Sequence, residues 1–186
     1  MDQRGLVERA RQGEHDAFAD LLDVRLARLD AAARLILRDG ELARDAVQET
    51  MIRAWRDLPG LRDPDRFDPW LQRLLANACL DLVRRRKRRV IEVELTPIDA
   101  PSTVDIATGL ADRQLLDQAL AGLAPGHRAV VALHYLLGMP LPEVAASLGI
   151  PIGTAKSRLH YALAAMRISV TAEPDTAPAT VAGGLA

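Results

Sequence analysis

Apolar residues recur along most of this chain at the three-to-four-residue spacing of an amphipathic helix, and this period constrains the fold more than any other feature. Four apolar stripes follow one another between residues 6 and 89, separated by breaks near Gly13, Gly40 and the Pro59–Gly60 pair. No segment alternates for long between apolar and polar residues, as a strand would. Aromatic residues make up only 3% of the chain, so its cores must consist mainly of aliphatic side chains, which suit packed helices. The sequence therefore predicts an all-α protein.

The helical pattern has one long interruption, which indicates two domains. Residues 90–111 contain four acidic residues, no Lys or Arg and two prolines, a composition that predicts a flexible acidic linker. Helical periodicity resumes at about residue 112 and persists to about residue 169, and the low-complexity residues 170–186 are expected to be a disordered tail. We therefore expect two small helical domains, 1–89 and 112–169, joined by the linker 90–111 and followed by the tail 170–186.

The charges are distributed unevenly, although they nearly cancel to a formal net charge of −1. The first 83 residues contain thirteen basic and sixteen acidic side chains, and the next six residues, RRRKRR, are all cations. Such a block at the end of a helix can neutralise several phosphates of a nucleic acid. It can equally be a solvated helix end, because a basic tract alone is weak evidence for a partner.

Several classes of protein are excluded by the composition. The single cysteine, Cys79, cannot form an internal disulfide or a cysteine-rich zinc site, and it is expected to be a small core residue. No stretch approaches the roughly 18–20 uninterrupted apolar residues of a membrane span. The first residues contain no apolar run of the kind found in a signal peptide. We therefore expect a cytoplasmic protein that does not insert into a membrane.

No constellation of residues in the sequence predicts catalysis. The four histidines have no metal-ligand spacing with one another, with Cys79 or with a carboxylate. His134, in the apolar segment ALHYLL, is expected to be in the core or partly buried. The chain has neither a glycine-rich phosphate loop nor a nucleophile elbow. We expect no catalytic residue, no metal, no cofactor and no small-molecule substrate.

The sharpest local signal lies in residues 141–167. A short apolar helix from Leu141 to Leu148 precedes Gly149, which can supply a tight turn, and Ile150, which can pack between helices. A longer helix is expected after Pro151. A short helix, a turn that contains glycine and a longer second helix are the plan of the DNA-binding helix-turn-helix.

The second helix of this motif has two faces with different chemistry. At about 100° per residue, small and apolar side chains share one face: Ala155, Leu159, Ala162 and Met166. The opposite face carries Gly153, Lys156, Ser157, His160 and Tyr161, with Thr154 and Arg158 beside it. Donors and cations near the start of such a helix suit base edges and phosphates. A solvated polar face on a helical bundle is the alternative interpretation.

A polar stripe on the third expected helix contains one apolar residue. The spacing of Asp45, Gln48, Glu49 and Ile52 places them on one face of that helix. An apolar side chain within an acidic stripe can seat a partner helix. A single exposed isoleucine is also normal on a protein surface, so the stripe alone does not decide between the two interpretations.

Three segments, in this order, resemble the bacterial extracytoplasmic-function (ECF) sigma factors of RNA polymerase. Residues 45–55, DAVQETMIRAW, are similar to the family's segment that binds core polymerase. Residues 67–89, FDPWLQRLLANACLDLVRRRKRR, are similar to its promoter-melting segment, and residues 141–162, LPEVAASLGIPIGTAKSRLHYA, to its helix-turn-helix. The resemblance covers about residues 6–168. It implies an alternative sigma factor with core RNA polymerase and promoter DNA as partners, and an anti-sigma factor as a candidate regulator.

The resemblance also implies roles for three groups of residues. One group would bind core polymerase: Asp45, Gln48, Glu49, Ile52 and Arg53. A second group would bind the unstacked strand of the minus-ten element, together with the loop 61–68: Asn77, Arg73, Arg84, Arg85 and Arg88. The third would read the minus-thirty-five element in the major groove: Thr154, Lys156, Ser157, Arg158 and His160. The acidic linker would pass through a basic channel of the polymerase.

The chain departs from the family's pattern in places that bear on these roles. Pro140 stands where a Ser or Thr cap is usual, so its side chain cannot cap the first helix of the helix-turn-helix. Ala155 stands where a larger β-branched residue is usual, and His160 where a basic residue is frequent. Asp68 places an acid beside the expected path of the single strand.

Two other functions are compatible with part of the sequence. A sigma-like decoy that binds an anti-sigma protein would keep the domain layout, but it would not need to keep Lys156, Ser157 and Arg158. A simple helix-turn-helix regulator would explain residues 112–167, but not the segment DAVQETMIRAW or the first helical domain with its basic end.

Overall fold

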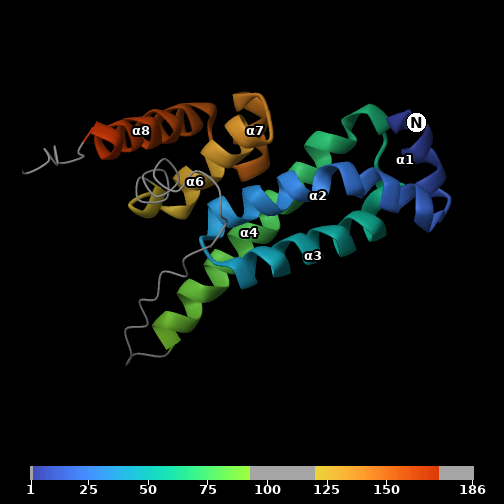
Figure 1. Cartoon of the computed structure of the whole chain (residues 1–186), viewed down its shortest axis with the longest axis horizontal. Helices are drawn as coiled ribbons and strands as arrows, with labels where there is room; N and C mark the ends of the chain where they lie inside the picture. Colours follow the sequence, from blue (N-terminus) through green and yellow to red (C-terminus); the bar gives the residue numbers. More distant parts are fainter. Residues whose placement is uncertain (1, 93–119, 172–186) are drawn as a thin grey trace, which may run out of the picture.

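The computed structural model describes residues 2–92 and 120–171, and every regular element in these two ranges is helical (Figure 1). The N-terminal part consists of α1 (Gln3–Arg11), α2 (His15–Leu37), α3 (Gly40–Asp57) and α4 (Phe67–Glu92). The longer helices of the C-terminal part are α6 (Pro125–Val131), α7 (Leu141–Leu148) and α8 (Ile152–Thr171). The predicted all-α fold is confirmed.

The expected linker and tail fall largely outside the described residues. α4 continues to Glu92, into the first positions of the expected linker, whereas residues 93–111 of the linker lie outside the described ranges. The same holds for residues 112–119 of the second expected domain and residues 172–186 of the expected tail. Within the described ranges, no helix is both long and apolar enough to cross a membrane.

The junction between α2 and α3 differs from its prediction. The sequence predicts a break at Gly40, but α2 ends at Leu37 and Gly40 is the first residue of α3. Arg38 makes the turn in a left-handed conformation with a φ of 54°. Asp39 then caps α3, because its carboxylate accepts hydrogen bonds from the backbone N–H groups of Glu41 and Leu42 at 3.1 Å. The cap decides where α3 begins, and the glycine does not interrupt it.

Aliphatic side chains from α1 to α4 form the N-terminal core, and Phe67 is fully buried among them at the start of α4. Near the C-terminal end of α3, the Trp55 ring stacks on His15 of α2 with ring centroids 4.4 Å apart. Cys79 is fully buried, and this burial raises the pKa of its thiol to about 12. It therefore occupies the core position that the sequence predicts, and at neutral pH it is an unreactive thiol.

The chain between α3 and α4 forms two short 3₁₀ turns, η1 (Leu58–Gly60) and η2 (Pro64–Arg66). The side chains of Leu58, Leu61 and Pro64 are buried, so the connection is anchored in the core at several points. The Asp63 carboxylate also accepts a hydrogen bond from the backbone N–H of Asp65 at 3.1 Å. Residues of the loop that precedes α4 thus contribute to its shape.

A wide turn ends α6. The helix runs directly into η3 (Ala132–Leu136), a π-helical segment in which the N–H of Leu137 donates to the carbonyl of Ala132 at 3.0 Å. Gly138 follows with a φ of 73° and redirects the chain toward α7. His134 within this segment is half-buried, and its Nδ1 lies 2.9 Å from the carbonyl oxygen of Met139. Because the helical hydrogen bonds end at this turn, the carbonyls of Leu136 and Leu137 are available to partners outside the helix.

α6, η3 and α7 pack on α2 and α4, α8 packs on α6 and α7, and one hydrophobic cluster includes buried side chains of both parts (Figure 1). Arg28 of α2 donates to the carbonyl of Leu136 at 2.7 Å, and Gln72 of α4 donates to the carbonyl of Leu137 at 3.2 Å. The sequence predicts two domains but contains no signal for this docking, which pairs polar groups that are far apart in the chain.

Arg128 is the most deeply buried polar link between the two parts. Its side chain is buried, and its Nε donates to the carbonyl of Ile36 at 2.9 Å, while Nη1 donates to the carbonyl of Leu123. Ile36 lies in the last turn of α2, where carbonyls lack helical partners and a cation is favourable. Burial and the neighbouring Arg38 lower the pKa of Arg128 to about 10, so its guanidinium remains charged at neutral pH.

Candidate nucleic-acid and polymerase interfaces

The turn between α7 and α8 is fixed by backbone hydrogen bonds. Gly149 ends α7 in the left-handed region with a φ of 64°. Its N–H donates to the carbonyl of Ala146 at 3.3 Å, and the N–H of Ile150 donates to the carbonyl of Ala145 at 3.0 Å. This pair of bonds is a Schellman motif. The motif needs a left-handed backbone conformation at the position of Gly149, which glycine adopts without strain. The expected tight turn is therefore present at Gly149.

The beginning of α7 lacks a side-chain cap, as the sequence predicts from Pro140. Pro142, in the first turn of α7, compensates in part, because its ring has a helical φ and it has no N–H to satisfy. Glu143 in the same turn places a carboxylate near the positive end of the helix dipole. The Pro140 carbonyl accepts from the N–H groups of Glu143 and Val144, which starts the helix without the usual cap.

α8 has the two faces that its sequence predicts. Ala155 and Ala162 are fully buried, and Leu159 and Met166 are partly buried against neighbouring helices. Five residues on the opposite face are exposed: Gly153, Lys156, Ser157, His160 and Tyr161. Thr154 and Arg158 are half-buried at the boundary between the faces. Ala155 packs with its side chain fully covered, so a small residue fits at this helix crossing.

Arg158 and its surroundings link the outward face of α8 to α6. Its guanidinium lies so close to Gly126 that a Cβ atom there would approach Nη1 to 3.0 Å. His127 lies beside it, with its ring centroid 5.0 Å from that of Tyr161. Burial and then the charge of Arg158 lower the pKa of His127, so the imidazole is neutral at neutral pH. Arg158 is therefore oriented by α6, whereas Lys156 and His160 form no ion pair with any described residue.

A basic line follows the outer side of α4. Counting about 100° per residue, Arg73, Asn77, Arg84 and Arg88 lie on one side of the helix, opposite the buried Leu71 and Leu75. Arg85 lies at the edge of this line. Arg73, Arg85 and Arg88 are exposed and make no ion pair with any described residue. Arg84 is paired with Asp81 at 3.1 Å. Three of the predicted cations, Arg73, Arg84 and Arg88, thus lie along one side of α4, with Arg85 at its edge.

The acidic face of α3 is largely open. Asp45, Gln48 and Ile52 are exposed, and the Ile52 side chain is 54% exposed although it is apolar. Glu49 and Arg53 are half-buried and paired with each other at 2.6 Å, and Arg53 also approaches Asp81 of α4 at 3.7 Å. The structure therefore leaves Asp45, Gln48 and Ile52 exposed to a partner. Arg53 lies at the edge of this face and joins α3 to α4.

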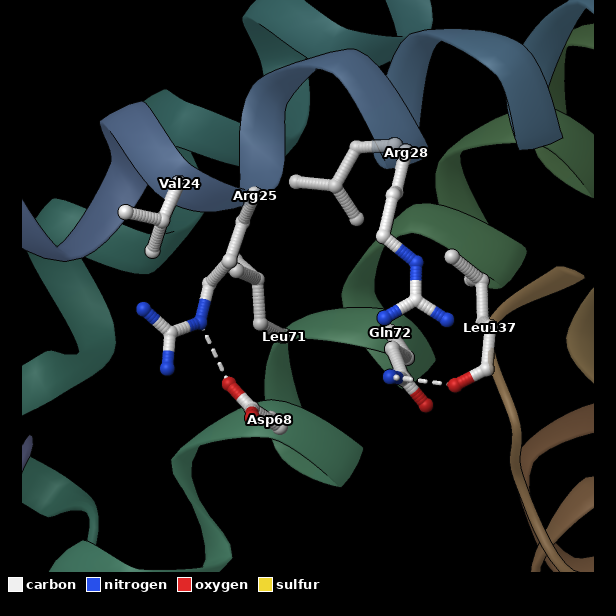
Figure 2. Close-up of a pocket in the computed structure, with 8 residues that line it drawn as sticks. Val24, Arg25, Arg28, Asp68, Leu71, Gln72 and Leu137 are labelled. Carbon is white, nitrogen blue, oxygen red and sulfur yellow. Dashed lines mark hydrogen bonds and ion pairs between the residues drawn. The ribbon is translucent and has the colours of Figure 1, made fainter.

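The loop 61–68 is connected to residues of α2 and α7 that no sequence pattern places near it. Asp68, at the start of α4, pairs with Arg25 of α2 at 2.5 Å, so its charge is neutralised within the protein (Figure 2). Arg66 pairs with Glu143 of α7 at 3.2 Å. The sequence holds one signal for Arg25, because it lies at helical spacing between Leu21 and Leu29 in an otherwise apolar stripe.

A helix-turn-helix with an exposed cationic face, a basic helix and an acidic face with one apolar residue define a class of protein that binds DNA together with a protein partner. Comparisons with known proteins agree. The Sigma-70 region 2 family matches residues 23–89, and the Sigma-70 region 4 family matches residues 113–166. All three groups of predicted residues lie within these matches.

Similar sequences extend over nearly the whole chain. The ECF RNA polymerase sigma factor SigL of Mycobacterium tuberculosis is 35% identical over 167 residues, which are 88% of this chain and 94% of SigL. The RNA polymerase sigma-E factor of Streptomyces avermitilis is 36% identical over 155 residues, covering 83% of this chain and 86% of that protein. The chain belongs to the ECF sigma factors of RNA polymerase. It is an alternative sigma factor, a regulatory protein of transcription initiation with core polymerase and promoter DNA as partners.

Two solved structures are similar in fold. The sigma factor RpoE of Bartonella quintana, in complex with the anti-sigma factor NepR, matches with a TM-score of 0.73 and 26% identity, over 84% of this chain and 98% of RpoE. CnrH, in complex with the cytosolic domain of CnrY, matches with a TM-score of 0.66 and 29% identity, over 92% of this chain and 99% of CnrH.

Proposed function

We propose that the two helical parts of this sigma factor divide promoter recognition between them, with residues 1–89 as one domain and 112–169 as the other. The N-terminal domain binds core polymerase and the melted minus-ten element. The C-terminal domain reads the minus-thirty-five element, and the linker 90–111 joins the two. The observation that carries the proposal is the exposed cationic face of α8, held by a glycine turn behind the short helix α7.

In the C-terminal domain, α8 enters the major groove with its N-terminal end. Lys156, Ser157 and His160 are exposed there and supply a cation and hydrogen-bonding groups for base edges and phosphates. Thr154 and Arg158 stand beside them, and Arg158 is oriented by its contact with α6. The group therefore combines residues that are available for bases with one whose direction is set by the fold.

In the N-terminal domain, the loop 61–68 and Asn77 take up an unstacked base of the minus-ten element. The strand backbone follows Arg73, Arg84, Arg85 and Arg88 along the outer side of α4. Single-stranded nucleic acid without paired bases is bound by such a combination of cations and a small polar pocket. The acidic face of α3 provides the polymerase contact: Asp45, Gln48, Glu49 and Ile52, with Arg53 at its edge.

The docked arrangement has to open when this function is carried out. The two promoter elements are centred about 25 base pairs apart, which is about 85 Å of duplex. A compact chain of this length has a radius of gyration of only about 16 Å. The contacts of Arg28, Gln72 and Arg128 between the two parts must therefore be exchanged for contacts with polymerase and DNA.

We also propose that the protein works in the cytoplasm, has no catalytic site of its own and is controlled by an anti-sigma factor. The similarity to the sigma factor RpoE, whose structure contains the anti-sigma factor NepR, supports this regulation. The test is to add a candidate anti-sigma protein. We expect the chain to co-purify with it, and transcription to be lost when it is present.

Run-off transcription tests the main proposal. Bacterial core polymerase is combined with the upstream region of the chain's own gene, with and without this protein. A discrete new transcript is expected, and its start site locates both promoter elements. Stable binding to core without a transcript from any tested promoter would favour a sigma-like decoy. Duplex DNA binding without polymerase binding would favour a simple helix-turn-helix regulator.

A further inference from the structure

Arg25 occupies a position in α2 where the helical pattern is otherwise apolar. Leu21 and Leu29, about one helical turn before and one turn after Arg25, are both buried. The side chain of Arg25 is itself only 18% exposed. A guanidinium in such a place is stable only when its donors are satisfied by the protein.

All three nitrogens of the Arg25 guanidinium have partners. Nε donates to Asp68 Oδ1 at 2.5 Å, Nη1 donates to the carbonyl of Leu21 at 2.6 Å, and Nη2 donates to Gln3 Oε1 at 2.6 Å. The guanidinium carbon lies 5.2 Å from the centroid of the buried Phe67 ring. Figure 2 shows the Arg25 side chain extending from α2 toward Asp68 at the start of α4. One side chain thus joins α1, α2 and the end of the loop 61–68.

Two further bonds extend this network into the loop. Gln3, which accepts from Arg25, donates through Nε2 to the carbonyl of Pro64 at 3.3 Å. The neighbouring Arg4 pairs with Asp65 at 2.5 Å. The loop is therefore held at η2 by α1 and at Asp68 by α2, and Arg25 is the residue common to both connections.

We propose that Arg25 is a positioning residue for the loop that takes up the minus-ten base. It acts through Asp68 and Gln3, which hold the loop in its binding shape before DNA arrives, so that less ordering is needed on binding. It also neutralises Asp68, which would otherwise place an unpaired acid beside a negatively charged strand. This inference rests on the proposed function, because it assigns a role within the same minus-ten site.

The test compares Arg25→Gln and Arg25→Lys with the matched control Arg34→Gln in reconstituted holoenzyme. Arg34 lies in the same helix and pairs with Asp30 at 2.6 Å, but neither residue touches the loop. Three quantities are measured on the promoter mapped by run-off transcription. These are permanganate reactivity of unpaired thymines at the minus-ten element, affinity for a single-stranded minus-ten oligonucleotide, and affinity for a minus-thirty-five duplex. Core binding and the melting temperature are measured for every variant.

Arg25→Gln is expected to lower single-strand affinity about tenfold or more, the usual effect of losing a charged hydrogen-bonding partner. Promoter melting should fall with it, while core binding and duplex affinity remain at the wild-type level. Arg25→Lys keeps the charge beside Asp68 but loses the hydrogen bond to Gln3. Its single-strand affinity and promoter melting should therefore lie between those of the wild type and Arg25→Gln. Arg34→Gln should match the wild type in all DNA readouts.

Gln3→Ala provides a variant that leaves the Arg25–Asp68 pair in place and removes the bridge by which Gln3 joins Arg25 Nη2 to the Pro64 carbonyl. It should show the same selective loss at the minus-ten element, to a smaller extent. Wild-type melting and single-strand binding by both Arg25→Gln and Gln3→Ala would overturn the proposal. So would an equal fall in every binding activity together with the melting temperature, which would leave Arg25 a purely structural role. A wild-type protein that initiates no transcription would instead contradict the proposed function itself.

Discussion

The loop 61–68 and the helix α8 are the two candidate DNA-reading elements, and they are held in place by different interactions. The loop depends on charged and polar side chains, because Asp68 is bound by Arg25 and Asp65 by Arg4. α8 depends on the backbone turn at Gly149 and on the burial of Ala155 and Ala162. The loop is therefore sensitive to the loss of single side chains, whereas the outward residues of α8 can change without affecting the fold. The docked arrangement adds a third condition, since it keeps both elements in one compact body.

Locking the docked arrangement should have the largest effect. In the double variant Arg28→Cys/Leu136→Cys, a short bis-maleimide should join α2 to η3, whose residues are in contact here. We expect the cross-linked protein to lose run-off transcription, because its two parts cannot reach both promoter elements. Each single-cysteine variant treated with the same reagent should remain active, and the buried Cys79 should not react. Full activity of the cross-linked protein would show that both elements are read in the docked state.

Arg128→Met should cause the largest loss of stability. It removes a buried guanidinium that donates to the carbonyls of Ile36 and Leu123, leaving both without these bonds. We expect the free energy of unfolding, measured in urea, to fall by about 2–4 kcal/mol. Arg44→Met is the control, because Arg44 forms only an exposed pair with Glu41 and its loss should cost little. An equally small effect at both positions would mean that Arg128 does not hold the two parts together.

Lys156→Ala should weaken DNA binding without changing stability. Lys156 is exposed on α8 and makes no ion pair with any described residue, so its removal leaves the fold unchanged. We expect about tenfold lower affinity of holoenzyme for a minus-thirty-five duplex, and a smaller dependence of affinity on salt if the contact is to phosphate. Lys156→Arg should recover most of the binding. Unchanged affinity would remove Lys156 from the recognition surface.

Gly149→Ala should destabilise the helix-turn-helix through its backbone alone. Apart from the two chain neighbours of Gly149, no atom of the described residues lies within 4 Å of a Cβ built at this position, but the φ of 64° is unfavourable for alanine. We expect a loss of about 1–2 kcal/mol in the free energy of unfolding. Gly153→Ala is the matched control in the same motif, since Gly153 is helical and its Cβ would also meet nothing. That substitution should stabilise the protein, and a loss of stability there would contradict the assignment.

His127 should give the smallest effect, seen as a pH dependence. Its pKa is lowered from the ordinary value of 6.5 by burial and by Arg158, so the unfolded chain binds a proton more readily than the folded one. The stability contributed by the neutral imidazole is complete above pH 6.5 and is lost as the pH falls through the lowered pKa. The wild type should therefore lose more melting temperature than His127→Gln on going from about pH 7.5 to about pH 5.5. Equal losses would show that His127 is not linked to folding.

Much of the local structure could be predicted from the sequence. The spacing of Ala155, Leu159 and Ala162 predicts the buried face of α8, because a helix places residues three and four apart on one side. Gly149 predicts the turn, because left-handed backbone is unstrained only at glycine. At Gly40 the same reasoning is wrong about the position of the break. Asp39 caps the next helix, and Arg38 takes the left-handed position in spite of its Cβ.

The candidate site, too, could be predicted from the sequence only in part. Periodicity alone places Arg73, Arg84 and Arg88 on one side of α4 and Ile52 within the acidic face of α3. It does not predict that Arg53 is tied to Asp81, or that Asp68 is neutralised by Arg25. Those partners lie on other helices, and side-chain pairs between helices depend on how the helices cross.

The sequence by itself determines the helical class of this protein, the helix-turn-helix and the family to which it belongs, because these follow from patterns within single segments. The tertiary structure decides what those patterns do together. The π-helical turn at η3 directs the carbonyls of Leu136 and Leu137 toward α2 and α4, and Arg128 reaches the end of α2. Such bonds join residues far apart in the chain, and their energies depend on burial and direction, which a linear pattern does not contain.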